Sequence, residues 1–262
     1  MTEFQTKKKF GQNFLTDKNL LSAICDDAQI TKEDEVLEIG AGMGALTEFL
    51  AKNAKRVVSF EIDRELKDYL LSKQFENVEF VFDDVMKHSL DEIEERFEGD
   101  YKIVANLPYY ITSPIIFKFL GKSKKLKSLT VMVQKEVAER MIADNRSKDY
   151  GVLSVSISVC ADAKITRGVN RKMFSPPPNV DSAVVRIDIK NKHDLDLDKF
   201  FEFAKKIFSM RRKTLLNNLS QGYAISKQQL ESVLGEDVLK KRAENFSPDE
   251  IVELFNKLKA IF

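Results

Sequence analysis

The chain has 262 residues, enough for one large domain or for a large domain followed by a small one. Its hydrophobic share of 43% suffices for a core, and no apolar run approaches the roughly 20 residues that span a bilayer. Met1–Phe10 is polar and lysine-containing, so it lacks the apolar centre of a signal peptide. The net charge of +1 excludes a globally basic nucleic-acid binder, so any such contact must come from local patches.

The cysteines and histidines form no metal-binding pattern. Cys25 and Cys160 lie far apart without Cys-x-x-Cys spacing, and His88 and His193 are each isolated. We expect no metal site, because a structural zinc needs ligands at short, regular spacing. Isolated cysteines also fit a reducing compartment, and the sequence predicts a cytoplasmic protein.

The first part of the chain alternates between β-rich apolar runs and helical patterns, which predicts a mainly parallel sheet with helices on both faces. The predicted strands are Glu35–Ile39, Arg56–Glu61, Val78–Phe82, Tyr101–Ala105 and Leu129–Val133. The predicted helices are Ala45–Lys52, Arg64–Ser72, Ser113–Leu120 and Lys135–Ala143. Val152–Cys160 and Ala183–Ile189 are interpreted as two further strands, the second an antiparallel edge strand.

The composition changes after Lys190. Asn191–Asp198 is polar and charged, which is typical of a linker. The pattern beyond it is helical throughout, over Leu197–Phe208, Lys213–Leu219, Lys227–Leu234 and Pro248–Leu258. Ser247 before Pro248 is a helix start, with a capping serine and proline at the first helical position. We therefore expect an α/β domain over residues 1–190 and an all-helical domain over residues 191–262.

A glycine-rich turn follows the first predicted strand. Gly40, Gly42 and Gly44 give Gly-x-Gly-x-Gly, so the backbone can approach a ligand closely at a helix start. The dinucleotide fingerprint requires Gly-x-Gly-x-x-Gly, and the phosphate loop requires a Lys-Ser/Thr pair that is absent here. A nucleoside cofactor without a pyrophosphate fits better, and S-adenosylmethionine is such a cofactor.

Acidic residues follow the next two predicted strands. Glu61 ends the second strand about twenty residues further on, where an acid can accept hydrogen bonds from ribose hydroxyls. Asp84 follows the third strand and can accept from the adenine N6 amine. Three successive strand ends thus supply a glycine loop and two acids, as expected at the carboxyl edge of an open α/β sheet.

The most informative stretch is Asn106-Leu107-Pro108-Tyr109, directly after the fourth predicted strand. The Asn106 side-chain oxygen can accept from an exocyclic amine, Pro108 stiffens the turn, and Tyr109 offers a flat face to a base. These groups suit an enzyme that methylates a planar amino group such as N6 of adenine. The competing interpretation is a strand-end turn built by Asn and Pro.

Several blocks of the chain, in order and at matching spacing, resemble the ribosomal RNA adenine dimethyltransferase family, in its bacterial small-subunit branch linked to kasugamycin sensitivity. The blocks are Lys9–Leu15, Glu38–Gly44, Asn106–Thr112, Gln134–Ala138, Phe174–Arg186, Arg211–Thr214 and Arg242–Asn245. Tyr110 departs from the commonest form of the motif, which carries Asn there and Ser where Thr112 stands.

The resemblance implies a Rossmann-like S-adenosylmethionine domain, a small helical domain, and dimethylation of two adjacent adenosines in a hairpin near the 3′ end of small-subunit ribosomal RNA. It also implies a set of cofactor contacts, with Gln12 and Asn13 folding over the cofactor as a lid. That set is Gln12, Asn13, Leu15, Gly40, Gly42, Glu61, Asp84 and Asn106.

For catalysis we expect Asn106 and the carbonyl of Leu107 or Pro108 to hold the amine, with direct transfer of the methyl group and no general base. The target base has to leave its stack, so Tyr109 would stack on one face of it. Phe174, beside the prolines of Ser175–Pro178, would press on the other face.

The expected partners are small-subunit ribosomal RNA and the assembling small subunit, bound by a monomer away from any membrane. Four basic runs are candidates for phosphate contacts: Lys7–Lys9, Lys122–Lys127, Lys205–Lys206 and Arg211–Lys213. Two of them supply the residues that we expect to bind RNA. The first, Arg211, Arg212 and Lys213, is predicted to open a helix. The second comprises Lys122, Lys124 and Lys125.

Other readings remain at this point. The large-subunit branch of the family, which gives macrolide resistance, shares the chemistry, although Phe174–Arg186 and Arg242–Asn245 favour the small-subunit branch. DNA adenine methyltransferases commonly place an acid where Asn106 stands. A non-catalytic ribosome assembly factor with this fold is the rival from another class, against which the intact glycine loop and Glu61 argue.

Overall fold

The computed structural model describes residues 14–15, 17–190 and 195–261. The chain divides into two compact units. The first holds the described residues up to Ala138 together with Ala163–Ile189. The second holds Glu139–Asp162 and the described residues from Lys190 onward. The sequence had grouped residues 139–162 with the first domain, whereas their contacts group them with the helices.

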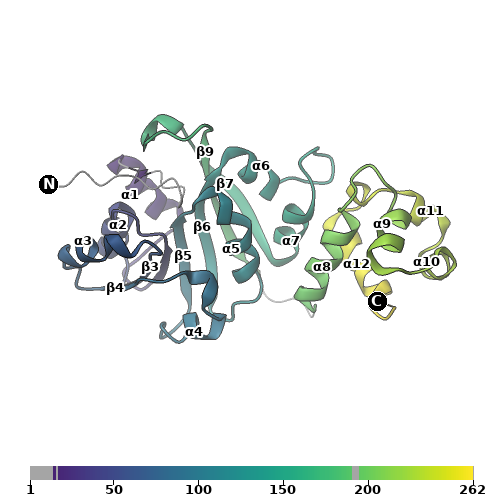
Figure 1. The fold of residues 1–262 in the computed structure, drawn as a ribbon, viewed down its shortest axis with the longest axis horizontal. Helices are drawn as coiled ribbons and strands as arrows, with labels where there is room; N and C mark the ends of the chain where they lie inside the picture. Colours follow the sequence, from purple (N-terminus) through teal and green to yellow (C-terminus); the bar gives the residue numbers. More distant parts are fainter. Residues whose placement is uncertain (1–13, 16, 191–194, 262) are drawn as a thin grey trace. The chain divides into compact units, whose positions relative to one another are not determined.

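A seven-stranded sheet organises the first unit, in the order β4-β3-β2-β5-β6-β9-β7 (Figure 1). The strands are β2 (Glu35–Ile39), β3 (Arg56–Phe60), β4 (Val78–Val81), β5 (Tyr101–Asn106), β6 (Leu126–Gln134), β7 (Ala161–Val169) and β9 (Ser182–Ile189). The first five of these pair in parallel, and β9 pairs antiparallel with β6. The strand order reverses between β2 and β5, the place where open α/β sheets bind ligands. The predicted Rossmann-like architecture is confirmed.

Helices bury the central strands. All five residues of β2 are buried, as expected for a strand covered on both faces. On one face, α1 (Lys18–Asp27) and α2 (Ala45–Asn53) share an apolar core with the strands. The remaining helices that start in this unit are α3 (Lys67–Ser72), α4 (Leu90–Glu94), α5 (Thr112–Phe119) and α6 (Lys135–Met141). None of the helices formed by the described residues has the length and apolar character to cross a membrane.

Two sequence predictions about strands are wrong. Val152–Cys160 is the helix α7, in which six of the nine residues are buried. Its Val-Ser alternation imitated a strand, but packing of this helix overrides the weak strand preference of valine. Ala183–Ile189 is antiparallel as predicted but is no edge strand, because β7 pairs outside it.

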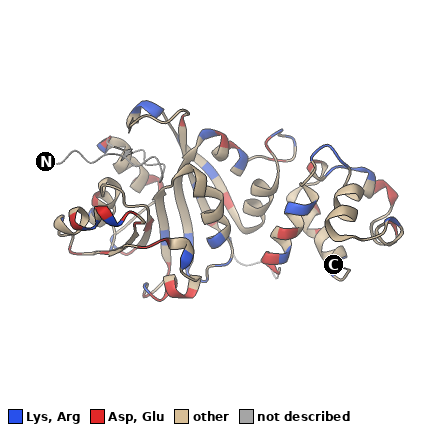
Figure 2. Ribbon diagram, viewed as in Figure 1, with Lys and Arg blue, Asp and Glu red and all other residues tan. Residues whose placement is uncertain are grey.

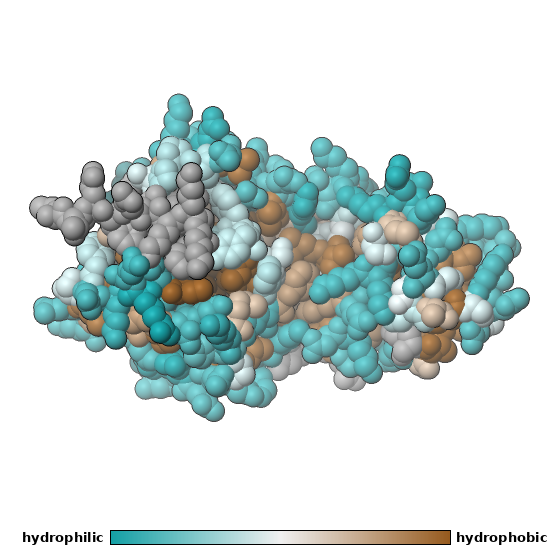
Figure 3. All heavy atoms as spheres, in the orientation of Figure 1, coloured by the Kyte–Doolittle hydropathy of each residue, from teal (hydrophilic) through white to brown (hydrophobic). Residues whose placement is uncertain are grey.

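The second unit is helical. Besides α7 it contains α8 (Leu197–Ile207), α9 (Leu215–Tyr223), α10 (Lys227–Leu234), α11 (Glu236–Lys240) and α12 (Pro248–Leu258). Three buried phenylalanine rings meet in its core: the Phe255 centroid lies 5.5 Å from that of Phe200 and 5.6 Å from that of Phe203. Ser247 caps α12 in a capping box, which confirms the predicted helix start. The visible surface of each unit is mostly hydrophilic, with smaller apolar patches (Figure 3).

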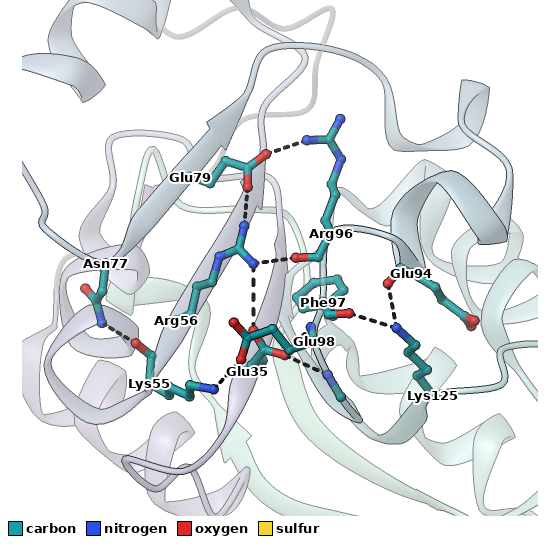
Figure 4. Close-up of polar contacts among 11 residues, drawn as sticks. Glu35, Lys55, Arg56, Asn77, Glu79, Glu94, Arg96, Phe97, Glu98 and Lys125 are labelled. Atoms are coloured by element: carbon teal, nitrogen blue, oxygen red, sulfur yellow. Dashed lines mark hydrogen bonds and ion pairs between the residues drawn. The ribbon is translucent and has the colours of Figure 1, made fainter.

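Charged side chains tie together the amino-terminal edge of the sheet (Figure 4). Arg56 donates to the backbone oxygen of Arg96 at 2.5 Å and to Glu79 at 2.6 Å. Glu79 also accepts from the Arg96 guanidinium. Glu35 lies 3.8 Å from Arg56 and accepts the Glu98 backbone N–H at 2.8 Å. The loop before β5 is therefore held by charged side chains.

Candidate functional site

The glycine loop after β2 has a backbone that only glycine adopts easily. Gly40, Gly42 and Gly44 have φ of 84°, 54° and 74°, all in the left-handed region. Gly40 donates to the Phe60 carbonyl at 2.8 Å, which ties the loop to the end of β3. Gly44 is the N-cap of α2 and supplies no side-chain cap. The loop therefore presents backbone and the amino end of a helix at the carboxyl edge of the sheet.

Glu61 holds this loop from the end of β3. One carboxylate oxygen accepts the Gly42 N–H at 2.7 Å, and the other accepts the Asp63 N–H at 2.8 Å. Burial raises the pKa of Glu61, and the charge of Asp63 adds to this, whereas backbone hydrogen bonds from Asp63, Gly42 and Ile62 lower it. A carboxylate has about four acceptor positions, so Glu61 can still accept from another donor.

A second buried acid, Glu38 in β2, was missed by sequence reasoning. It is 0% exposed, and one oxygen accepts from the hydroxyls of Thr47 at 2.7 Å and Ser59 at 2.6 Å. Its other oxygen has no hydrogen-bond partner among the described residues. Burial raises the pKa of Glu38 to about 7. The available signal was a glutamate inside an otherwise apolar buried strand.

Asp84 follows β4 and borders a pocket in the first unit. Its carboxylate accepts the Met86 N–H at 2.9 Å and caps a short turn. The pocket is lined by Gly40, Ile62, Asp84 and Tyr110, among other residues. The ends of β2, β3 and β4 and the turn after β5 therefore meet at one place, as the sequence predicted.

The turn after β5 lies against the glycine loop. A Cβ added to Gly40 would lie 3.9 Å from the Asn106 backbone oxygen. The Pro108 carbonyl accepts the Ile111 N–H at 3.1 Å and the Thr112 hydroxyl at 3.4 Å. Of the two predicted carbonyl acceptors, Pro108 is therefore already engaged, which leaves Leu107.

Tyr109 is half-buried and anchored at its hydroxyl. Its oxygen lies 2.8 Å from the Ser182 hydroxyl at the start of β9. Burial raises the pKa of Tyr109, with a further contribution from Asp181, while the bond to Ser182 lowers it. The phenol is therefore neutral at physiological pH, and its ring is fixed beside Asn106-Leu107-Pro108.

The predicted place of Phe174 on an open loop is wrong. Phe174 belongs to the short strand β8 (Phe174–Ser175), which pairs with β1 (Phe14–Leu15). Its side chain is 4% exposed and lies in the apolar core cluster, as does that of Leu15. Pairing with a strand far away in the sequence outweighed the loop preference suggested by the prolines, so Phe174 offers no open face to a base in this structure. Gln12 and Asn13 lie outside the described residues.

Comparison with known proteins decides the family. The family model for ribosomal RNA adenine dimethylases matches residues 3–260. The chain belongs to this family. A Ribosomal RNA small subunit methyltransferase A of Bacillus pumilus is 42% identical, with 99% of this chain and 94% of that protein covered. One from Bacillus licheniformis is 41% identical, with 98% and 93% covered.

Solved structures agree with the family assignment. A dimethyladenosine transferase from Plasmodium falciparum is 29% identical, with a TM-score of 0.78 over 94% of this chain and 98% of that chain. The 23S rRNA methyltransferase ErmE is 27% identical, with a TM-score of 0.65 over 94% and 100%. As a member of the dimethylase family, the protein is an rRNA adenine methyltransferase that uses S-adenosylmethionine, which confirms the predicted enzyme class and cofactor.

A second site in this dimethylase is a basic cleft within the helical unit. Five exposed basic residues and two acids border it: Arg146, Lys148, Arg211, Arg212, Arg242, Asp149 and Glu244. The segment that joins α8 to α9 also contains Lys and Arg residues (Figure 2). The surplus of positive charge suits a polyanion.

The predicted helix start at Arg211–Lys213 is wrong. The helix α9 begins at Leu215 with Thr214 as its cap, so the basic cluster lies in the turn before it. Arg211 donates to the Lys148 carbonyl at 2.6 Å and lies 3.8 Å from Glu244. Arg211 therefore helps to shape the cleft, and Arg212 is exposed beside it.

The other predicted basic cluster lies at the edge of the sheet opposite to Asn106. Lys122, Lys124 and Lys125 precede β6, at the amino-terminal edge of the sheet, whereas Asn106 ends its neighbour β5. Lys124 pairs with Asp91 at 3.1 Å, and Lys125 donates to the Phe97 carbonyl at 2.8 Å. These contacts favour a structural role for the cluster.

Proposed function

We propose that this dimethylase converts two adjacent adenosines in the 3′-terminal hairpin of 16S ribosomal RNA to N6,N6-dimethyladenosine. The relatives named Ribosomal RNA small subunit methyltransferase A support this choice of RNA. The observation that carries the chemistry is the contact between the Asn106 turn and the left-handed glycine loop. It puts acceptors for an amine beside the expected cofactor loop.

The residues at this edge fit S-adenosylmethionine. Backbone groups of Gly40 to Gly44 would lie along the cofactor, Glu61 would accept from its ribose hydroxyls, and Asp84 would accept from its adenine amine. The left-handed glycines and the pocket beside Asp84 support this arrangement. When bound, the cofactor supplies an electrophilic methyl group on a sulfonium.

Asn106 and Leu107 would orient the target amine. The N6 lone pair of adenine is delocalised into the ring, so the amine must be held by acceptors that turn its lone pair outward. The Asn106 amide oxygen and the Leu107 carbonyl are the acceptors we propose, because the Pro108 carbonyl is engaged in its own turn. The same dipoles stabilise the positive charge that develops on nitrogen. The methylated ammonium then loses its proton to water without a general base.

Tyr109 would receive the flipped base on its ring face. The hydrogen bond to Ser182 fixes the ring before the base arrives, which reduces the entropy lost on binding. Phe174 is not included in this stacking role because of its burial.

The RNA backbone would lie along the basic cleft of the helical unit. This proposal keeps the predicted division into a catalytic domain of residues 1–190 and an RNA-substrate domain of residues 191–262, and adds the basic loop of Arg146 and Lys148. The partner would be small-subunit rRNA within the assembling subunit. The proposal includes a cytoplasmic location, where small subunits are assembled, and action as a monomer.

Replacing Asn106 tests the chemistry. Asn106→Ala should lower kcat by about 10²-fold, the scale for removing one transition-state hydrogen-bond partner. The dissociation constant for RNA should stay within about two-fold. Methylation is measured on 16S rRNA in small subunits, with 23S rRNA as the competing substrate. Normal turnover by the variant would reduce Asn106 to a turn residue, and preferential labelling of 23S rRNA would replace the proposed substrate.

The cleft is tested by salt dependence. Replacing Arg212 and Arg242 by Ala should flatten the log–log salt slope of RNA binding by roughly two units, one for each lost phosphate contact. Lys124 and Lys127 are the matched control, since Lys124 lies just before β6 and Lys127 near its start, at the amino-terminal edge of the sheet. An unchanged slope in the arginine variant would place the RNA elsewhere.

A further inference from the structure

Tyr110 is a large aromatic side chain that is 60% exposed beside the expected cofactor site. The side chain borders the same pocket as Asp84 and Ile62. Ile62 is itself among the exposed large apolar residues. Two exposed apolar groups at one pocket suggest a surface that a ligand covers.

Tyr109 and Tyr110 serve different sides of one turn. Both belong to the 3₁₀ turn Tyr109–Ile111. The Tyr109 hydroxyl is bound to Ser182, whereas Tyr110 lines the pocket at the ends of β2 to β4. Consecutive residues of a 3₁₀ turn point about 120° apart, which explains why the two rings diverge.

The surroundings of Tyr110 match the edges and faces of adenine. Partial burial, followed by the charges of Asp84 and Glu61, raises the pKa of the Tyr110 phenol, so both carboxylates act on it. Adenine has two apolar faces and an amine at one edge. A pocket with an aromatic ring, an aliphatic side chain and a carboxylate supplies a partner for each of these.

We propose that Tyr110 forms the aromatic wall of the pocket that holds the adenine ring of S-adenosylmethionine, with Ile62 as its aliphatic counterpart. The inference rests on the proposed cofactor site and adds a residue that sets its affinity.

Calorimetry with S-adenosylhomocysteine and with 5′-methylthioadenosine tests the proposal. The second probe lacks the amino-acid half of the cofactor, so it reports on the adenosine contacts alone. Tyr110→Asn should weaken both probes by about 5- to 150-fold, the range for a lost base–aromatic stack. Tyr110→Phe keeps the ring and should stay within about two-fold of wild type. The matched control is Tyr69→Asn. Tyr69 is also an exposed tyrosine of the same unit, with 43% of its surface accessible, and its replacement should leave both affinities unchanged.

The outcomes separate this inference from the proposed cofactor site. If Asp84→Ala weakens both probes and Tyr110→Asn weakens neither, the pocket holds adenine but Tyr110 is not its wall, and the inference is overturned. If neither variant changes the affinity of either probe, the cofactor site itself is misplaced. A higher KM for RNA with an unchanged affinity for S-adenosylhomocysteine would assign Tyr110 to the target base and also overturn the inference.

Discussion

Glu38 makes stability depend on pH in a way that one substitution can remove. The side chain is 0% exposed, and its pKa is raised from 4.5 to about 7 in the folded protein. Between these values the folded state keeps a proton that the unfolded state has released. The free energy of unfolding therefore falls as pH rises, by about 1.4 kcal/mol per pH unit for this group. The full loss is about 3 kcal/mol, of which roughly 2.5 kcal/mol falls between pH 5 and pH 8.

Glu38→Gln keeps the shape of the side chain and abolishes its titration. The amide oxygen can still accept from Thr47 and Ser59, which now donate to one carboxylate oxygen. Relative to wild type, the variant should therefore gain about 2.5 kcal/mol in free energy of unfolding between pH 5 and pH 8.

Urea unfolding of both proteins at pH 5, 6, 7 and 8 measures this difference. The difference between the two proteins cancels the contribution of groups that titrate alike in both. The gain should accumulate between pH 5 and pH 7 and level off above pH 7. A difference that stays constant across the series would show that Glu38 does not take up a proton on folding.

Three further substitutions have expected effects on unfolding by urea. Gly44→Ala should cost about 1–3 kcal/mol, because φ is +74° and the new Cβ would lie 3.0 Å from a leucine methyl group, whereas Gly99→Ala, with open space around it, should cost little. Phe174→Ala should lower the free energy of unfolding by about 3–5 kcal/mol, because it truncates a core side chain. A variant that loses methylation activity but keeps its stability would instead support stacking of Phe174 on the target base. Tyr150→Phe should cost about 1–3 kcal/mol, because it leaves the Phe246 carbonyl, now bonded at 2.9 Å, without its donor, and an unchanged midpoint would contradict this.

The sequence was sufficient to predict which residues meet at the carboxyl edge of the sheet. Gly40, Glu61, Asp84 and Asn106 each follow a predicted strand, and parallel strands bring their carboxyl ends to one edge whatever their order. That rule needs only local patterns. The binding roles of these residues remain predictions.

Features that depend on packing could not be predicted. The α7 segment alternates Val and Ser like a strand, and its helix is stabilised by packing that buries six of its nine residues. The edge position of β7 depends on pairing between distant segments. Phe174 was assigned to a loop from its prolines, whereas a two-residue pairing with β1 buries it. In each case a long-range contact outweighed a local preference.

The charged network around Arg56 has a consequence for how this protein can vary. Glu79, Arg96 and Glu35 fix the sheet at its amino-terminal edge, so the register of β3 and β5 does not depend on the turn after Asn106. Substitutions in that turn therefore leave these contacts at the opposite edge of the sheet in place.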